Sequence, residues 1–394
     1  MKQLTYQHTV LACHGAGISQ AIVNNFTPLV LLTLQETYGL PLEQITLLIT
    51  VNFLTQLTVD FLGARYVDRI GHRTCMVAAH VLCAAGLVGL CVLPDVLPPF
   101  AGLLLAVMVY AVGGGLIEVL NTPIADACPS DNRSAAMSLL HSSYCWGSVL
   151  TVLLSTALFS LLGMERWRLV ACLWALFPLA VALLFTWVPM APIVPEGEKG
   201  MSFSELVRQK SFWLLVMLMV CAGASEMSMS QWASAFAESG LQVSKTLGDL
   251  AGPCFFSVLM GTARVLYAKL AEKVELEKYM AGCALLCVGS YVLAVLPLHP
   301  VVNLLGCGLC GFALGVFWPG TCSLATRICP LGGTAMFGLL ALGGDLGCSF
   351  GPTMVGLVAD LFSGRLKAGL AVAAVFPALI IVGIGLLRKA NVRH

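Results

Sequence analysis

The residues best placed to do chemistry in this sequence are polar and acidic side chains that interrupt long apolar stretches. Glu118 is the clearest case, within the run Gly113–Pro123, and Asn121 follows one helical turn later on the same face. A carboxyl group among apolar residues can take up and release a proton near neutral pH. We therefore expect Glu118 to carry a proton, the alternative being an acid that is permanently protonated or paired for structural reasons.

Uncharged polar residues recur at helical spacing in other apolar stretches. Gln20 and Asn24 lie one turn apart in the first stretch, and His141 lies in the fifth. Amide groups both donate and accept hydrogen bonds, so such a face suits a ligand rich in hydroxyl groups. We expect Gln20, Asn24, Asn121 and His141 to contact substrate, and hydrogen bonding between helices is the alternative for each. A further polar face is formed by Asn52, Gln56 and Asp60.

The second half of the sequence has its own candidates. Glu226 follows Gly223 and is a second acid that could carry a proton, or could pair with a base. Trp232 and Trp318 offer aromatic rings against which a sugar can lie flat. Trp318 precedes Pro319, which predicts a bend in the helix, so cavity lining and packing both remain open for this ring.

Two opposite charges in the second half form an expected pair. Arg264 and Asp345 both lie in apolar stretches, where an isolated charge is costly. A structural role in gating is favoured for the two residues. Arg264 could instead pair with Asp60, or bind the carboxylate of a substrate.

The elements that position these residues are membrane-spanning helices. Of 394 residues, 58% are hydrophobic and only 10% are charged, whereas soluble domains are about 25% charged. Apolar stretches of about 20 residues, enough to cross a bilayer, recur along the chain. We predict an all-α membrane protein with spans at 8–34, 43–66, 74–93, 99–127, 134–162, 167–189, 212–237, 247–270, 279–297, 301–328, 334–362 and 367–388.

The distribution of positive charge predicts the orientation. Of the 21 Lys and Arg residues, five lie in the expected outer loops, Arg264 lies within a helix, and the other fifteen lie on the opposite side. Positive residues favour the cytoplasmic side, so both termini are expected there. The first apolar stretch is too long for a signal peptide and is expected to remain as a helix. Short loops favour a bacterial inner membrane.

The sequence pattern predicts that the chain consists of two related halves. Asp68-Arg69 and Glu272-Lys273 follow corresponding helices 204 residues apart, and Cys128-Pro129 and Cys329-Pro330 end corresponding helices 201 residues apart. We predict a six-helix half at 1–190, a cytoplasmic loop at 191–210 and a second half at 211–394. Such repeats place a substrate site near the midplane of the membrane, as in transporters.

One loop carries a family signature. The segment Ala64–Arg73 resembles the loop motif of the major facilitator superfamily, Gly-x-x-x-Asp-Arg-x-Gly-x-Arg, with Ala64 where Gly is usual. The resemblance implies twelve helices in two pseudo-symmetric halves. It also implies that Asp68, Arg69 and Arg73 hold one face of a transporter closed rather than touch the cargo.

Within that superfamily, the sequence is similar to the fucose permease group of sugar–proton symporters. The similarity rests on Gly115-x-x-Glu118 with Asn121 and Pro123, on Leu139–Gly147, and on Gly223–Trp232. It implies that Glu118 couples protons, while His141 replaces a sugar-contacting Gln. Asn24 falls where the group has an Asp that matters for transport, and a neutral amide at this position cannot carry a proton.

These features predict a secondary transporter that moves a small hydroxylated solute, a sugar being favoured, together with protons. A proton-driven exporter of drugs or amphiphiles is an alternative, supported by Gly351-Pro352 and its neighbouring glycines. A second alternative is an organic-anion carrier that uses Arg264 to bind the carboxylate. A third is a sensor that binds solute without moving it, but the sequence shows no signalling tail, which counts against this alternative. Enzymatic activity, metals, cofactors and nucleic-acid binding have no support, and a monomer in the lipid bilayer is expected.

Overall fold

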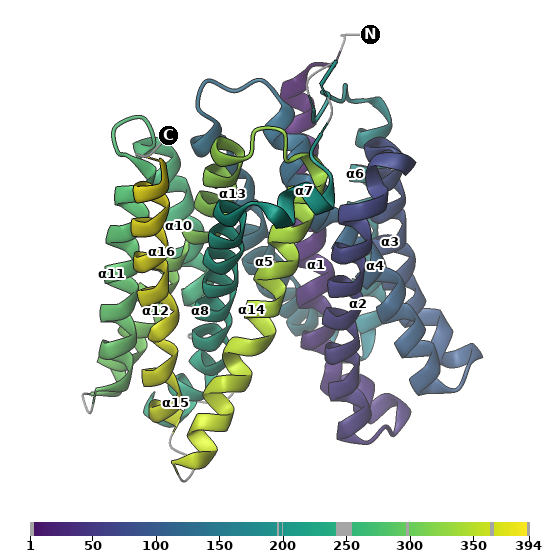
Figure 1. The fold of residues 1–394 in the computed structure, drawn as a ribbon. Coiled ribbons are helices and arrows are strands. Elements are labelled where there is room, and N and C mark those ends of the chain that lie inside the picture. Colours follow the sequence, from purple (N-terminus) through teal and green to yellow (C-terminus); the bar gives the residue numbers. More distant parts are fainter. Residues whose placement is uncertain are drawn as a thin grey trace. The chain divides into compact units, whose positions relative to one another are not determined.

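The computed structural model describes residues 4–194, 197–198, 200–241, 254–296, 299–362 and 366–391, which are helical with short connections and contain no strand (Figure 1). Eleven helices of the described part are long and apolar enough to cross a membrane. The helices are α1 (Tyr6–Tyr38), α2 (Leu42–Ile70), α3 (His72–Val96), α4 (Pro99–Ala127), α5 (Arg133–Leu162), α6 (Trp167–Trp187), α7 (Phe203–Arg208), α8 (Lys210–Leu241), α10 (Phe255–Leu270), α11 (Leu276–Val295), α12 (Pro300–Leu314), α13 (Phe317–Ile328), α14 (Gly333–Leu361), α15 (Leu366–Ala373) and α16 (Val375–Asn391), with the 3-10 turn η1 (Met164–Arg166) before α6.

The helices coincide with the predicted spans, with three differences in detail. The eighth predicted span, 247–270, begins outside the described residues and continues as α10. The tenth span is divided into α12 and α13 at Gly315–Val316, just before the predicted bend at Trp318-Pro319. The twelfth is divided at Ala374, since α15 ends at Ala373 and α16 begins at Val375.

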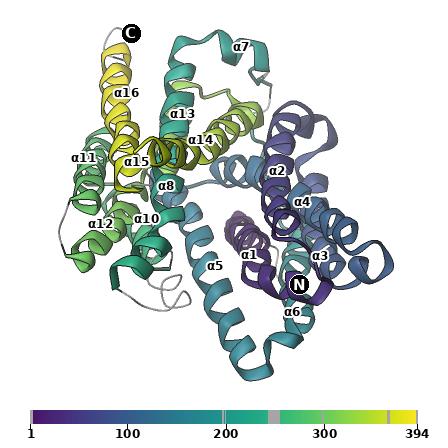
Figure 2. The same cartoon turned by 90° about the horizontal axis from the view of Figure 1, so that it is seen from below.

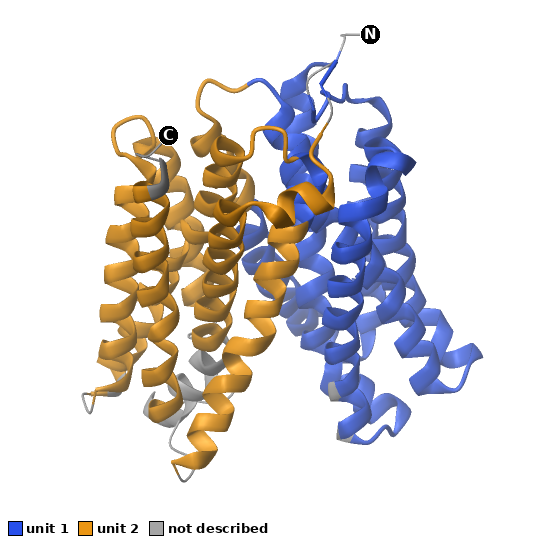
Figure 3. Cartoon of the chain, viewed as in Figure 1, with its two compact units in different colours: residues 1–129, 143–199, 333–338 blue, residues 130–142, 200–332, 339–394 orange. Residues whose placement is uncertain are grey.

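The chain divides into two compact units (Figure 3). Unit 1 comprises 1–129, 143–199 and 333–338, and unit 2 comprises 130–142, 200–332 and 339–394. Each unit contains most of one predicted half, but α5 has its first residues in unit 2 and α14 has its first residues in unit 1. The bounds predicted for the two halves stay a prediction.

Glycines allow α3 and α4 of unit 1 to pack closely. A Cβ atom on Gly86 of α3 would lie 2.5 Å from the Cβ atom of Tyr110 and 2.6 Å from its backbone nitrogen on α4. Real side chains do not approach so closely, so a glycine is required at this contact. The Tyr110 hydroxyl in turn donates to Thr27 of α1 at 2.9 Å, which joins a third helix to the pair.

In unit 2, α11 lies beside both α12 and α16, as Figure 2 shows from below. The Tyr291 hydroxyl of α11 donates to the backbone oxygen of Ser225 on α8 at 2.6 Å. Asn303, near the start of α12, donates to the carbonyls of Leu293 and Leu296 at the end of α11. At the other end of α11, a hydrogen bond from Lys278 holds the pKa of Glu275 below its usual range.

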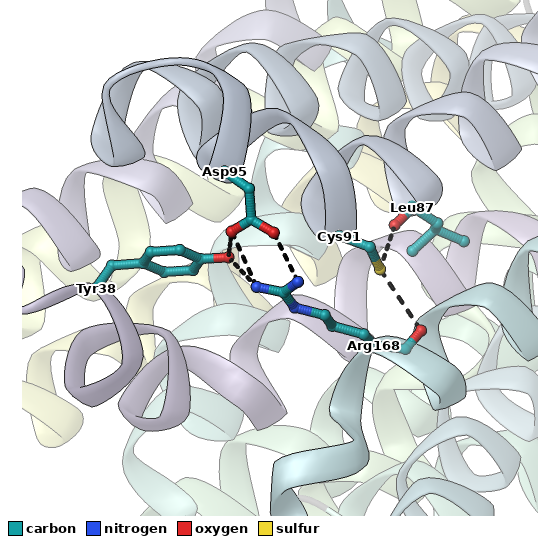
Figure 4. Close-up of polar contacts among 5 residues, drawn as sticks. All are labelled: Tyr38, Leu87, Cys91, Asp95 and Arg168. Atoms are coloured by element: carbon teal, nitrogen blue, oxygen red, sulfur yellow. Dashed lines mark hydrogen bonds and ion pairs between the residues drawn. The ribbon is translucent and has the colours of Figure 1, made fainter.

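A charged cluster joins three helix ends of unit 1 (Figure 4). Arg168 at the start of α6 binds both carboxylate oxygens of Asp95 near the end of α3, at 2.7 and 3.0 Å. The same guanidinium donates to the hydroxyl of Tyr38, the last residue of α1, at 2.9 Å. A fork-shaped guanidinium suits such a bidentate contact, so the cluster fixes the spacing of α1, α3 and α6 at this end.

The close contact at Gly86 predicts a large effect of a small substitution. Gly86→Val should destabilise the protein by about 1–3 kcal/mol, because the new side chain cannot enter without moving α4 away from α3. The measurement is the thermal unfolding midpoint of the purified chain in detergent. Gly282→Val is the matched control, because nothing lies within 4 Å of a Cβ atom at that position of α11. Equal shifts for both variants would contradict the close contact.

Candidate functional site

The predicted proton carrier of unit 1 is bonded to a predicted substrate residue. Gln20 of α1 donates from Nε2 to Oε2 of Glu118 on α4 at 2.7 Å. Both residues lie within helices long and apolar enough to span a membrane. The amide and the carboxylate thereby satisfy each other's hydrogen-bonding groups between α1 and α4.

A second amide pair joins α1 to α2. Gln56 of α2 donates from Nε2 to Oδ1 of Asn24 at 2.8 Å and to Oδ1 of Asn52 at 3.1 Å. Gln56 is 2% exposed and Asp60, one turn further on, is fully buried. The side-chain oxygen of Asn24 therefore serves as an acceptor within unit 1, and a neutral amide meets this need without adding a charge.

Asn121 offers an acceptor that no other described residue uses. Its side chain is 8% exposed, and its Oδ1 atom has no hydrogen-bond partner among the described residues. A Cβ atom on Gly17 of α1 would contact the amide nitrogen of Asn121 at 3.8 Å. Nearby, the ring of His14 is hydrogen-bonded to the hydroxyl of Ser143 on α5. A buried acceptor without a partner is costly, and a ligand hydroxyl group could satisfy it.

In unit 2, Arg264 of α10 supports the break between α12 and α13. Pro319 has no N–H group, so the carbonyl of Gly315, four residues earlier, lacks its helical donor. The Nε atom of Arg264 donates to that carbonyl at 3.0 Å, and Nη1 donates to the backbone oxygen of His141 at 2.7 Å. The backbone oxygen of Arg264 accepts from Ser138 of α5 at 2.8 Å. Arg264 thus joins three helices of unit 2, and its predicted pairing with Asp345 stays a prediction.

The other predicted residues of unit 2 lie on several helices. Glu226 of α8 is half-buried and interacts electrostatically with Arg264. The indole of Trp318 lies against Gly344 of α14, the residue before Asp345, where a Cβ atom would clash with the ring. His141 is half-buried, and the side chain of Trp232 lies outside the described residues although its backbone belongs to α8.

The loop signature binds the start of α14 in unit 1. The His72 ring contacts Asp68 at 2.9 Å and the hydroxyl of Thr334 at 3.0 Å. Thr334 is the second residue of α14, so the acid lies near the positive end of this helix. Ala64 is 5% exposed, and its Cβ atom would lie 2.7 Å from a Cβ atom on Gly338. The small residue of the signature is therefore matched by a glycine on α14.

Arg73 has a different partner from Asp68. Its guanidinium donates to the backbone oxygens of Phe185 at 2.7 Å, Thr186 at 3.0 Å and Val188 at 2.8 Å. These carbonyls belong to the end of α6, where helical donors run out and the helix dipole is negative. Arg73 therefore caps α6, while Arg69 is exposed and its guanidinium lies over the ring of Tyr66 at 5.9 Å.

Sequence reasoning missed several partners in these networks. Gln56 belonged to a recognised polar face but was not chosen as a site residue, and Ser143 and Thr334 were not considered. The i to i+4 spacing of Asn52 and Gln56 was the available signal for the first. The bonds of Ser143 and Thr334 join residues 129 and 262 positions apart, and no local pattern indicates them.

Apolar helices of this length, divided between two units, define a polytopic membrane protein of the transporter type. Residues 13–352 match the Major Facilitator Superfamily, and the chain belongs to this family of transporters. No curated protein sequence matches the chain.

Solved structures of the same fold include two symporters. FucP, the E. coli fucose:proton symporter, is 14% identical in sequence to this chain. Its structure in the outward conformation aligns over 96% of this chain and 98% of FucP, with a TM-score of 0.81. The proton:xylose symporter XylE is 15% identical, with 97% and 95% covered and a TM-score of 0.80. The human organic anion transporter MFSD10 is 18% identical, with 97% and 99% covered and a TM-score of 0.76. The major facilitator fold predicted from the loop signature is confirmed.

The geometry of Arg264 predicts that lysine cannot replace it. Arg264→Lys keeps the positive charge but cannot donate to the Gly315 and His141 carbonyls together, because an ammonium lacks the fork of a guanidinium. A lost bond from a charged donor costs about 1.5–3 kcal/mol, so the thermal unfolding midpoint should fall clearly. Arg388→Lys, at an exposed position of α16, should leave the midpoint unchanged. A midpoint for Arg264→Lys equal to that of the unaltered protein would contradict the role in the helix break.

Proposed function

We propose that this transporter carries a small hydroxylated solute, a sugar in the favoured case, together with protons by alternating access. The observation that carries the proposal is the bond between Gln20 and Glu118 within the membrane-spanning part of unit 1. The fold shared with FucP, a fucose:proton symporter, and with XylE, a proton:xylose symporter, supports the same conclusion.

Glu118 is the proposed proton carrier, and Glu226 is the second candidate. Protonation of Glu118 removes the negative charge that Gln20 binds, so the Gln20 amide becomes available to a solute hydroxyl group. Asn121, one turn from Glu118, offers its unused oxygen to the same solute. Solute and proton then favour the same conformation, which is what coupling requires. Asn24, His141, Trp232 and Trp318 complete the proposed set of solute contacts.

The proposed transporter has a defined orientation, oligomeric state and coupling ion. Both termini face the cytoplasm of a bacterial inner membrane, the protein acts as a monomer in the bilayer, and the coupling ion is H⁺ with no further cofactor. The loop signature controls access from the cytoplasmic side. In this role Asp68 and His72 hold the start of α14, while Arg73 keeps the end of α6 in place.

An organic anion is the second candidate for the cargo. The human organic anion transporter MFSD10 shares the fold, and Arg264 is a buried cation at 4% exposure. The carbonyls of Gly315 and His141 already take up donors of Arg264, which leaves the guanidinium less able to bind a carboxylate. Export of drugs or amphiphiles rests on the Gly351-Pro352 pattern alone. A sugar is therefore favoured.

The role of Glu118 predicts a specific loss of coupling. In proteoliposomes with a pH-sensitive dye inside, the transported monosaccharide should acidify the lumen in the unaltered protein. Glu118→Gln should still exchange the sugar but lose acidification about tenfold or more, because the amide cannot carry a proton. Glu36→Gln, at an exposed position near the end of α1, is the control and should couple normally.

Three results would redirect this proposal. If Glu118→Gln couples normally, Glu118 is structural and Glu226 or Asp60 becomes the acid to test. If a carboxylate moves protons and no sugar does, the organic-anion alternative replaces the sugar. If a cationic drug moves protons in the opposite direction, the protein is an exporter.

The contact of Asp68 with the start of α14 predicts an effect on turnover without an effect on binding. Asp68→Asn removes the charge near the positive end of α14, which is worth about 0.3–1 kcal/mol and hence a two- to fivefold change in the conformational equilibrium. Sugar exchange should change by this factor while the Kd for the sugar stays constant. Thr334→Ser keeps the hydroxyl group that binds His72 and should behave normally. A matching change in Kd would place Asp68 at the solute site instead.

A further inference from the structure

Unit 2 contains a polar cavity that none of the proposed solute or proton residues lines. Its volume is about 530 Å³, and it lies where the start of α5 meets the end of α13. Seven of its eight lining residues have polar or charged side chains. This volume falls within the range of pockets that bind small molecules, about 300–1,000 Å³. The cavity is on the side of unit 2 that we expect to face the cytoplasm.

Two arginines supply the charge of this cavity. Arg133 is the first residue of α5, and Arg327 is in the last turn of α13. Arg327 donates from Nη2 to the hydroxyl of Ser134 at 3.1 Å, and its Nη1 atom lies 3.7 Å from Glu277. The contact with Glu277 is longer than a hydrogen bond, so it offsets the charge of Arg327 only in part. Arg133 is exposed.

The first turn of α5 adds a third favourable contribution. Asn132 accepts from the backbone nitrogen of Ala135 at 3.0 Å and so caps the helix. The N-terminal end of this 30-residue helix carries a partial positive charge and lies at the cavity, beside Arg133 and Arg327. One acid, Asp131, also lines the cavity, so the charged lining residues sum to one positive charge in favour of an anion.

Two of the three hydroxyl groups that line the cavity are already committed as donors. Ser323 donates to the carbonyl of Pro319, and Thr326 donates to the carbonyl of Ser323. They therefore contribute polarity but not a donor for an anion. The two guanidinium groups are the charged donors that an anion would meet, and the amide of Asn132 adds a neutral donor. Guanidinium groups bind phosphate oxygens in pairs, which favours a phosphate over a spherical ion such as chloride.

We propose that this cavity binds a phosphate group, with Arg133 and Arg327 as its ligands. Phosphate here is either the headgroup of an anionic lipid or a free phosphate from the cytoplasm. A bound phosphate connects the start of α5 to the end of α13 and neutralises both arginines. It therefore stabilises unit 2 at this junction, and this effect is independent of the identity of the transported solute.

The test uses the purified full-length chain in neutral detergent. In the first arm, inorganic phosphate is titrated against chloride at constant pH and ionic strength while the thermal unfolding midpoint is followed. In the second arm, native mass spectrometry measures how much phosphatidylglycerol stays bound after extraction from vesicles of phosphatidylcholine and phosphatidylglycerol. Saturable binding in the first arm alone identifies a free phosphate, and binding in the second arm alone identifies a lipid headgroup.

Variants decide whether the cavity is responsible. Arg133→Gln and Arg327→Gln should each weaken binding about tenfold, because one charge-assisted contact to the phosphate is lost. Arg388→Gln removes an exposed arginine of α16 that does not line the cavity, and it should have no effect. If Arg327→Gln fails to fold, the exposed Arg133→Gln decides the outcome alone. The proposal is overturned if neither phosphate nor phosphatidylglycerol binds saturably, or if Arg133→Gln binds as tightly as the unaltered chain.

Discussion

The constraint on which the rest of this structure depends is that backbone polar groups inside a membrane need partners within the protein. The break between α12 and α13 is the clearest example. Pro319 leaves the Gly315 carbonyl without its helical donor, and Arg264 takes the place of that donor. A cation that would be costly alone is thus held by carbonyl groups, and it lies within electrostatic range of Glu226. Trp318 is the second residue after this break, and its ring lies against Gly344, the residue before Asp345.

Helix ends in both units carry cations that bind acceptors on neighbouring helices. Arg168 of α6 binds Asp95 near the end of α3 in unit 1. Lys367 of α15, 199 positions later, donates to the carbonyl of Leu296 after the end of α11 in unit 2. A carboxylate in one unit and a backbone carbonyl in the other accept from the corresponding cation. In each unit a cation at the start of one helix thus meets an acceptor at the end of another.

Much of the fold could be predicted from the sequence, because apolar length, positive charge and the Ala64–Arg73 signature are local properties. The polar faces of the first and fourth spans were local as well, and the structure joins them through Gln20 and Glu118. The hydrogen bonds of His14 with Ser143 and of Arg327 with Ser134 could not be predicted from the sequence. They depend on how each helix is rotated about its axis, which no local pattern in the sequence specifies. The cavity beside Arg133 was missed for the same reason.

The starts of α5 and α14 are each held by a polar contact. Each helix begins in one unit and continues in the other, and each start is held by hydroxyl contacts: Thr334 by His72, and Ser134 by Arg327. A hydrogen bond of this kind contributes about 1 kcal/mol net, far less than the burial of a large apolar side chain in the core of either unit. A solute or proton needs only a modest difference in affinity between two conformations to shift such an equilibrium. Polar contacts at these two helix starts therefore suit a transporter that must open and close repeatedly, whereas apolar packing there would favour one conformation too strongly.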